Sequence, residues 1–500
     1  MKLTTALLFS VLGMTLSSVS VWALAPQGGP ATGKESTATV ADPASDDAVK
    51  LAQLVGLGGT PTFSAGTTLV MEGRLGHPTL AAGRESETFL FLDVKAATEG
   101  SARATTPVNL AIVLDRSGSM QGERMTNALA AAQGMIRRLR DGDTVSVVGY
   151  NTSTQVLLAP TRIDNRSRDF ALASLRGVEA LGNTCVSCGV EAAMELLGRG
   201  ETGAVQRILL LSDGEANSGI RDVDGFRRLG DRARTMETAV SSIGVDVDYN
   251  ERVLFALAQA SNGRHYFVDN PSGLPRIFDD ELQSLVSTVA SNASVDIQLA
   301  PGVTVAQVFD RSFDQRGDVV TVPFGAFGAG DEKTVLLRLR VPASDSGRRP
   351  IADVRMRYAD LVTGKPGDCT GELVAMLSRD ASDVSPLDPL VETRLARSET
   401  TAALALANEQ FARGDVDLAR STLSSNRGRI RSRRDEASGA APAPAKAAVE
   451  KDFERQIGAL EQAEAEFGNA ATVSPSAPQD SRSGKEQVRR NADLFDDLAQ

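Results

Sequence analysis

Between residues 105 and 290, short apolar runs alternate with stretches of helical spacing. The runs lie at residues 108–114, 144–150, 207–212, 237–245 and 265–268. Between the first two runs, apolar residues recur every three or four positions, the period of an amphipathic helix. These residues are Met125, Leu129, Ala132 and Ile136. Strands that alternate with helices are typical of a parallel sheet with crossover helices, so the pattern predicts a doubly wound α/β domain over residues 105–290.

The segments on both sides of this domain have the composition of strands without intervening helices. Two such runs precede it, at residues 67–74 and 87–94, and six follow it, at residues 295–299, 303–308, 319–322, 333–341, 351–358 and 371–377. These runs predict an antiparallel β-sandwich built from residues 62–104 and 291–380. Because two strands alone are marginally stable, we expect the early strands to pair with the later ones, so that the α/β domain is inserted in the sandwich.

The two ends of the chain differ from this pattern. Residues 381–436 are rich in Ala, Glu and Arg and predict a helical hairpin, with a basic run at 427–434 that we interpret as solvated helix ends. Residues 437–500 predict an Ala/Pro linker over 437–447 and an amphipathic helix, with disorder at 471–484.

Residues 1–25 follow the order of a secretory signal peptide, and residues 26–61 predict a flexible linker. We therefore expect an exported protein, periplasmic or secreted, or held at the inner membrane if the signal segment is not cleaved.

Composition narrows the function classes. Acidic residues outnumber basic ones by 64 to 53, and no basic segment carries interleaved aromatic residues, which argues against a nucleic-acid partner. With 2 His and 3 Cys, the chain cannot assemble a multi-histidine or a four-cysteine zinc site. Cys185 and Cys188 are close in sequence, and in an oxidising compartment we expect them to form a local disulfide. Cys369 is then left over, either buried or available for an intermolecular bond.

Oxygen-bearing side chains follow the predicted strands of the α/β domain. Asp115, Ser117 and Ser119 come directly after the first strand, Thr184 precedes a helix, and Asp213 follows the strand at 207–212. Doubly wound folds place ligands at the carboxyl ends of their strands, so these three loops are expected to converge. Carboxylates and hydroxyls suit a hard divalent cation, Mg²⁺ first, with Mn²⁺ or Ca²⁺ as alternatives.

The same five residues resemble the metal-ion-dependent adhesion site of the von Willebrand factor type A domain, and each position of that motif is matched. The flanking strands are similar to those of bacterial envelope proteins related to calcium-activated chloride channel regulators and inter-alpha-inhibitor heavy chains. The resemblance implies a bound divalent cation whose remaining position is taken by an acidic residue of a protein partner. It also implies that the site works by coordination, without catalysis.

The favoured interpretation is thus a non-enzymatic, metal-dependent protein-binding module, for adhesion or scaffolding, in the bacterial cell envelope. A subunit of an envelope channel or secretion assembly is the first alternative. A hydrolase that uses the metal to activate water is the second. Membrane contact is expected only through an uncleaved signal segment.

Overall fold

The computed structural model describes residues 62–98, 106–198, 204–214, 216–246, 249–474 and 476–499. The predicted signal segment at 1–25 and the linker at 26–61 lie outside these residues. Among the described residues, no helix is both long enough and apolar enough to cross a membrane.

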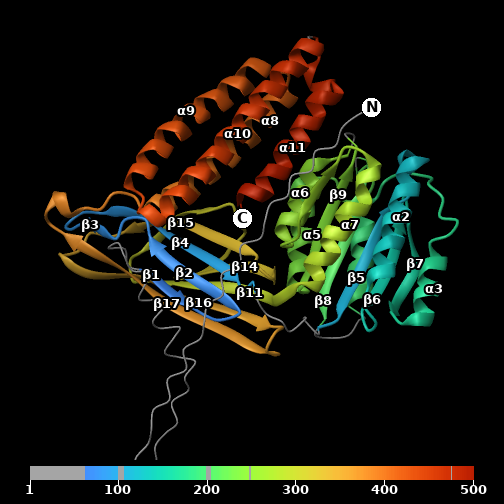
Figure 1. Cartoon of the computed structure of the whole chain (residues 1–500), viewed down its shortest axis with the longest axis horizontal. Coiled ribbons are helices and arrows are strands. Elements are labelled where there is room, and N and C mark those ends of the chain that lie inside the picture. Colours follow the sequence, from blue (N-terminus) through green and yellow to red (C-terminus); the bar gives the residue numbers. More distant parts are fainter. Residues whose placement is uncertain are drawn as a thin grey trace, which may run out of the picture. The chain divides into compact units, whose positions relative to one another are not determined.

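Among its described residues, the α/β domain contains six strands and six α-helices. Figure 1 shows these strands as one sheet with helices beside it. Its strands are β5 (Val108–Asp115), β6 (Thr144–Tyr150), β7 (Thr154–Arg162), β8 (Val205–Ser212), β9 (Thr238–Val245) and β10 (His265–Val268). Its helices are α2 (Glu123–Arg138), α3 (Asn165–Ser174), α4 (Val186–Leu197), α5 (Val223–Thr235), α6 (Glu251–Ala260) and α7 (Leu274–Val286). The strand order is β10-β9-β8-β5-β6-β7, and all neighbours are parallel except β6 and β7.

Both faces of this sheet are covered by helices. Leu110, Ile112 and Leu114 of β5 pack in an apolar core with α2, α3 and α7. Ala111 and Val113 point the other way, into a core with α4, α5 and α6. A strand buried on both faces has a continuous run of apolar residues, and this run allowed β5 to be predicted from the sequence. The doubly wound fold predicted for this region is confirmed.

The flanking strands form two antiparallel-based sheets. One has the order β1 (Thr62–Ala65), β2 (Leu69–Leu75), β4 (Ser86–Ala96), β15 (Glu332–Val341) and β12 (Thr304–Phe309). The other has the order β13 (Asp314–Arg316), β14 (Val319–Gly328), β11 (Thr288–Leu299), β16 (Gly347–Asp360), β17 (Lys365–Ser378) and β3 (Thr79–Ala81). Apolar side chains from both sheets share one core.

Strand pairing shows that the α/β domain is inserted in this sandwich. β4 precedes the domain in the chain and β15 follows it, yet the two pair from Lys95 opposite Glu332 to Ser86 opposite Val341. β3 also pairs with β17, which lies far away in sequence. The expected pairing with late strands is therefore observed for the strand predicted at 87–94. The strand predicted at 67–74 pairs with β1 and β4 and joins the late strands only through β4. β11 begins at Thr288, so the boundary predicted at residue 290 falls inside a strand.

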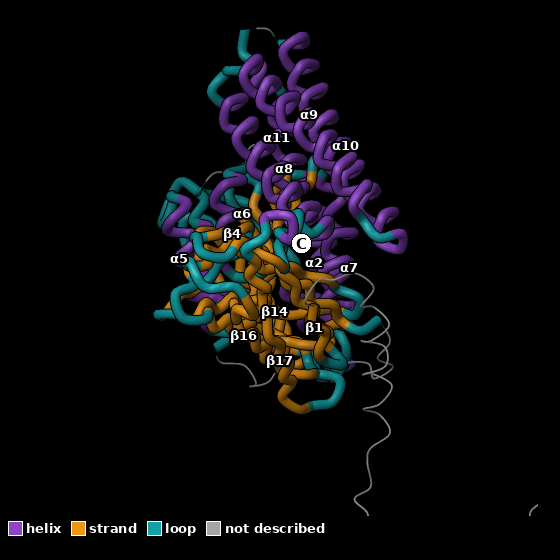
Figure 2. The backbone as a smooth tube through the Cα atoms, turned by 90° about the vertical axis from the view of Figure 1, so that its left-hand side faces the viewer, coloured by secondary structure: helices purple, strands orange, loops and turns teal. Residues whose placement is uncertain are grey.

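In the described part of the chain, four α-helices follow the sandwich, where a hairpin, a linker and one further helix were predicted (Figure 2). They are α8 (Pro389–Ala412), α9 (Val416–Ala440), α10 (Ala443–Val473) and α11 (Arg482–Ala499). The predicted linker at 437–447 is wrong, because α10 starts only three residues after α9 ends. One of its two prolines, Pro444, lies in the first turn of α10, where a missing backbone N–H costs nothing. The predicted disorder at 471–484 is also wrong, since α10 and α11 extend into it.

The basic run at 427–434 lies within α9, away from the helix ends where we expected it. Arg427 pairs with Glu464 at 2.8 Å, and Arg433 pairs with Glu399 at 2.9 Å. These acidic partners belong to α10 and α8, so the arginines connect neighbouring helices. The core between these helices is apolar. It includes the stacked rings of Phe411 and Phe467, whose centroids are 4.1 Å apart.

Candidate metal centre

The predicted ligands lie at one edge of the parallel sheet. β5 ends at Asp115 and its neighbour β8 ends at Ser212, directly before Asp213. The two strands are parallel and in register, with Leu114 opposite Leu211, so their following loops start side by side. Thr184 lies in the loop before α4.

Asp115 is held rigidly at the bottom of the site. Its side chain is fully buried and accepts hydrogen bonds from the Ser117 N–H at 2.8 Å, from Tyr150 OH at 3.0 Å and from Ser212 Oγ at 3.0 Å. Burial raises the pKa of Asp115 to about 6, and the Asp213 carboxylate adds to this rise. A nearby positive charge would favour the ionised form of such a group.

Tyr150 reaches Asp115 because α4 carries a glycine at the point of contact. A Cβ atom on Gly189 would lie 2.7 Å from Cδ1 of the Tyr150 ring, closer than packed atoms allow. Gly189 therefore lets the helix approach the ring that positions the carboxylate. Tyr150 and Ser212 were not identified from the sequence as parts of this site.

The remaining predicted ligands form a connected chain. Ser117 Oγ and Ser119 Oγ are 3.0 Å apart, and Ser119 Oγ donates to Asp213 Oδ1 at 2.7 Å. A Cβ atom built on Gly214 would lie 3.5 Å from Ser119 Oγ and 3.7 Å from Thr184 Oγ1, so both hydroxyls face the same space. The structure thus brings all five predicted residues together. Ser119 is exposed and the other four are buried, which places the opening of the site at Ser119.

The chemistry of these donors fits a hard divalent cation. Two carboxylates and three hydroxyls are oxygen ligands of the kind that Mg²⁺, Mn²⁺ and Ca²⁺ prefer. Within the described part of the chain, no group of three or more His, Cys, Asp and Glu side chains could hold a metal.

Arg124 is the neighbour of this site that sequence reasoning missed. It lies in the first turn of α2, and its Nη1 donates to Asp213 Oδ2 at 2.8 Å and to the Ser119 carbonyl at 3.1 Å. Its Nη2 contacts Asp246. A single arginine on a helix surface has no distinctive sequence pattern, so only the fold reveals that it neutralises Asp213.

Arg124→Gln should raise the affinity for Mg²⁺ by about two- to fivefold. The side chain is partly exposed, and ion pairs of this kind contribute about 0.2–1 kcal/mol that a bound cation would have to replace. Isothermal titration calorimetry with MgCl₂ measures the change, and Arg124→Lys, which keeps the charge, is the matched control. A lower affinity in Arg124→Gln than in Arg124→Lys would show that Arg124 supports the site.

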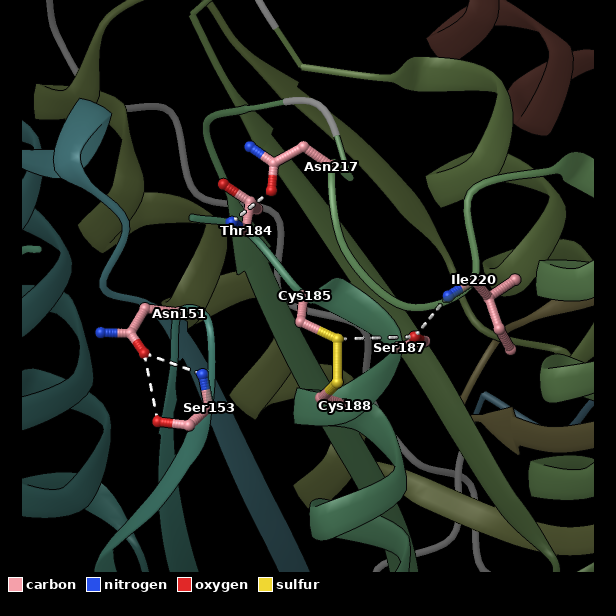
Figure 3. The surroundings of a disulfide bond; sticks show 8 residues. All are labelled: Asn151, Ser153, Thr184, Cys185, Ser187, Cys188, Asn217 and Ile220. Atoms are coloured by element: carbon pink, nitrogen blue, oxygen red, sulfur yellow. Dashed lines mark hydrogen bonds between the residues drawn. A yellow bond between two sulfur atoms is a disulfide. The ribbon is translucent and has the colours of Figure 1, made fainter. Parts of the chain in front are cut away.

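Cys185 and Cys188 form a disulfide at the start of α4, directly after Thr184 (Figure 3). The loop containing Thr184 is fixed from the other side by Asn217, whose Oδ1 accepts the Thr184 N–H at 2.8 Å.

The third cysteine, Cys369, is buried in the sandwich, and its thiol donates to the Leu69 carbonyl at 3.6 Å. Burial raises the pKa of Cys369 to about 11, which keeps the thiol protonated at neutral pH.

Reducing the disulfide is expected to change metal affinity more than stability. The two cysteines are three positions apart, and closing so short a loop contributes about 2 kcal/mol. A double Cys185→Ala, Cys188→Ala variant should lose no more than about 2 kcal/mol of unfolding free energy. It should bind Mg²⁺ clearly more weakly, because the Thr184 loop is less restrained. Unchanged Mg²⁺ affinity together with a large loss of stability would show that the disulfide stabilises the fold and does not restrain the metal site.

Comparisons with known proteins agree with the fold of the α/β domain. Residues 109–280 match the family model of the von Willebrand factor type A domain. The Synechocystis sp. protein sll0103 is 29% identical over 270 residues, which are 52% of this chain and 63% of that protein. Inter-alpha-trypsin inhibitor heavy chain H4 of Bos taurus is 22% identical, over 48% of this chain and 26% of its own length. The chain thus spans less than two thirds of these relatives.

A solved structure extends the likeness beyond the α/β domain. The von Willebrand factor type A protein from Catenulispora acidiphila superposes with a TM-score of 0.67 at 18% identity, over 86% of this chain and 98% of that one. At this identity the comparison concerns the fold, including the flanking sandwich and helices. Taken with the family match, it shows that this chain contains a von Willebrand factor type A domain, formed by residues 109–280.

Proposed function

We propose that this protein is a non-catalytic binding module that captures an acidic side chain of a protein partner through a divalent cation held at the five-residue site. Von Willebrand factor type A domains typically mediate metal-dependent protein interactions. The observation that carries the proposal is the hydrogen-bonded chain from Ser117 through Ser119 to Asp213, beside the buried Asp115. Mg²⁺ is the expected ion, with Mn²⁺ or Ca²⁺ as alternatives.

Each residue has a defined task in this proposal. Asp115 and Asp213 would supply the negative charge that holds the cation, and neither is exposed to solvent. Ser117, Ser119 and Thr184 would contribute neutral oxygens. When bound, the cation supplies positive charge that only two carboxylates offset, which leaves it attractive to a further anionic oxygen. Because Ser119 is the exposed member, a partner carboxylate would approach from its side.

We also propose that the protein works in the cell envelope, as a periplasmic, secreted or membrane-held component. The signal-like order of residues 1–25 and the Cys185–Cys188 disulfide support this location, because disulfides persist in oxidising compartments. Fractionation followed by mass spectrometry of the first residues tests the location and the cleavage together. A cytosolic protein with reduced cysteines would contradict it.

A capture experiment tests the proposed function. The full-length protein is immobilised and exposed to solubilised envelope proteins in MgCl₂ or in EDTA, and wild type is compared with Thr184→Ala. We expect partners that are retained by wild type in Mg²⁺ and lost in EDTA and in Thr184→Ala, by about tenfold or more. Thr235→Ala is the matched control, because Thr235 is exposed at the carboxyl end of α5 and outside the site. Partners that remain bound in EDTA would place the interface elsewhere.

A further inference from the structure

A cavity that is separate from the proposed metal site lies between the α/β domain and the sandwich. Its volume is about 90 Å³, and its lining includes four cationic side chains, Arg207, Arg264, Arg311 and Lys333. These come from β8, from the turn before β10, from the segment after β12 and from β15. A water needs about 10–15 Å³ in such a cavity, so the space is large enough for an ion of about five heavy atoms.

The two carboxylates in the lining are already engaged by donors of their own. Asp310 Oδ2 accepts from Arg394 Nη1 at 2.9 Å and from Ser398 Oγ. Asp331 Oδ2 accepts the Gly328 N–H at 2.8 Å. Each carboxylate thus accepts hydrogen bonds from groups other than the four cations of the cavity.

Arg207 is the most buried of the four cations. It is 6% exposed, its Nη1 donates to Ser241 Oγ at 2.9 Å, and Nη1 lies 3.5 Å from Glu281 Oε2. Glu281 also accepts from Tyr266 OH at 2.6 Å. The Nε of Arg207 is buried and has no hydrogen-bond partner among the described residues. A buried donor of this kind is costly unless a ligand or water satisfies it.

Two further cations are anchored by uncharged groups. Lys333 Nζ donates to the carbonyls of Phe324 at 3.0 Å and Ala326 at 2.7 Å. Arg311 Nε donates to the Thr334 carbonyl at 2.7 Å, and its guanidinium lies 5.0 Å from the Phe324 ring centroid. The contacts of Lys333 hold its amine in place without cancelling its charge. The lining and its immediate neighbours Arg394 and Glu281 together carry five cationic side chains and three carboxylates.

We propose that this cavity binds a free, compact oxoanion of charge −2, of the class of sulfate or hydrogen phosphate. Such an ion matches the cavity in size and balances the excess of two positive charges. Arg207, whose Nε has no partner among the described residues, is among the residues that line the cavity. Because its ligands come from both the α/β domain and the sandwich, the bound anion would tie the inserted domain to its platform.

Protonation of the Lys333 amine should be linked to anion binding. Burial and, after it, the Arg311 charge lower the pKa of Lys333 to about 7, whereas Asp331 opposes this. Arg264 and Arg207 also face Lys333 and add to the lowering. A bound anion favours the charged amine, so affinity is expected to be higher at pH 6 than at pH 8. Sulfate keeps its charge across this range, so it separates the effect of Lys333 from that of the ligand.

The test is calorimetric titration of the full-length protein with sodium sulfate at constant ionic strength. We expect saturable binding in wild type, several-fold tighter at pH 6 than at pH 8, and at least about tenfold weaker in Lys333→Gln and in Arg207→Gln. Arg340→Gln is the matched control. Arg340 lies on the same strand β15 but is exposed and pairs with Glu87 at 3.3 Å.

Lys333→Gln is the decisive variant, because Arg207→Gln also leaves Glu281 without its cation and can fail to fold. Circular dichroism of each variant shows whether it is folded before titration. Wild type that shows no saturable sulfate binding, or equal affinity in wild type and folded Lys333→Gln, would overturn the proposal. A phosphoserine peptide that binds while sulfate and phosphate do not would also overturn it, since the ligand would then not be a free ion.

Discussion

Asp213→Asn is expected to lower the affinity of the protein for Mg²⁺ by at least about 100-fold. Asp213 is fully buried, and it is one of two carboxylates in the proposed metal site. Replacing even an outer neighbour of a metal ligand costs about 10- to 100-fold in affinity, so removing the charge of a direct ligand should cost more. Asparagine keeps the shape and can still accept the hydrogen bond from Ser119. Calorimetric titration with MgCl₂ gives the affinity.

Asp246→Asn is the matched control for this prediction. Asp246 undergoes the same change and also contacts Arg124, but it is not among the five proposed ligands. Its Mg²⁺ affinity should stay within a few-fold of wild type. If both variants lost affinity equally, the effect would come from the general field around Arg124 and not from coordination by Asp213.

Deleting residues 62–98 should unfold the sandwich and leave the α/β domain folded. The deletion removes six side chains of β2 and β4 that have no solvent exposure, Leu69, Met71, Leu75, Leu90, Leu92 and Val94. At about 1.5–3 kcal/mol each, their burial contributes about 9–18 kcal/mol, as much as the total stability of a typical domain. β15 also loses β4, the one of its two neighbours that pairs with it along its whole length, and keeps only β12.

Hydrogen exchange followed by mass spectrometry measures this effect region by region. Amides at 291–380 should exchange rapidly in the shortened protein, and a fragment of residues 105–290 should keep its slowly exchanging strands. A sandwich with unchanged protection after the deletion would show that the late strands form a stable unit alone. The inserted arrangement would then have no energetic role.

The fold was predictable wherever burial leaves a strong pattern. β5 and β8 are buried on both faces and appear as apolar runs, and β16 alternates between buried and exposed positions along much of its length. β7 was missed because it is an edge strand with mostly exposed residues. The start of α10 was missed because its Ala and Pro residues resemble a linker, although the neighbouring helices provide the packing that stabilises it.

The candidate site was predictable for a different reason. Asp115 and Asp213 directly follow apolar strands, and the ends of parallel strands must meet at one edge. Thr184 follows no strand. It was included as a hydroxyl on a loop directly before a helix, and it also matches the family motif. Arg124 and the cationic cavity had no sequence signal, since Arg207 and Lys333 belong to separate domains and meet only through tertiary packing.

The most direct test of the central claim is the anomalous diffraction of Mn²⁺ in crystals of the full-length protein. If the five oxygens form a divalent-cation site, one strong anomalous peak should lie among the side chains of Asp115, Ser117, Ser119, Thr184 and Asp213. The peak should be absent from crystals of Asp213→Asn grown in the same conditions. Mn²⁺ bound at another position, or a peak that persists unchanged in the variant, would contradict the assignment of this site and the binding function proposed from it.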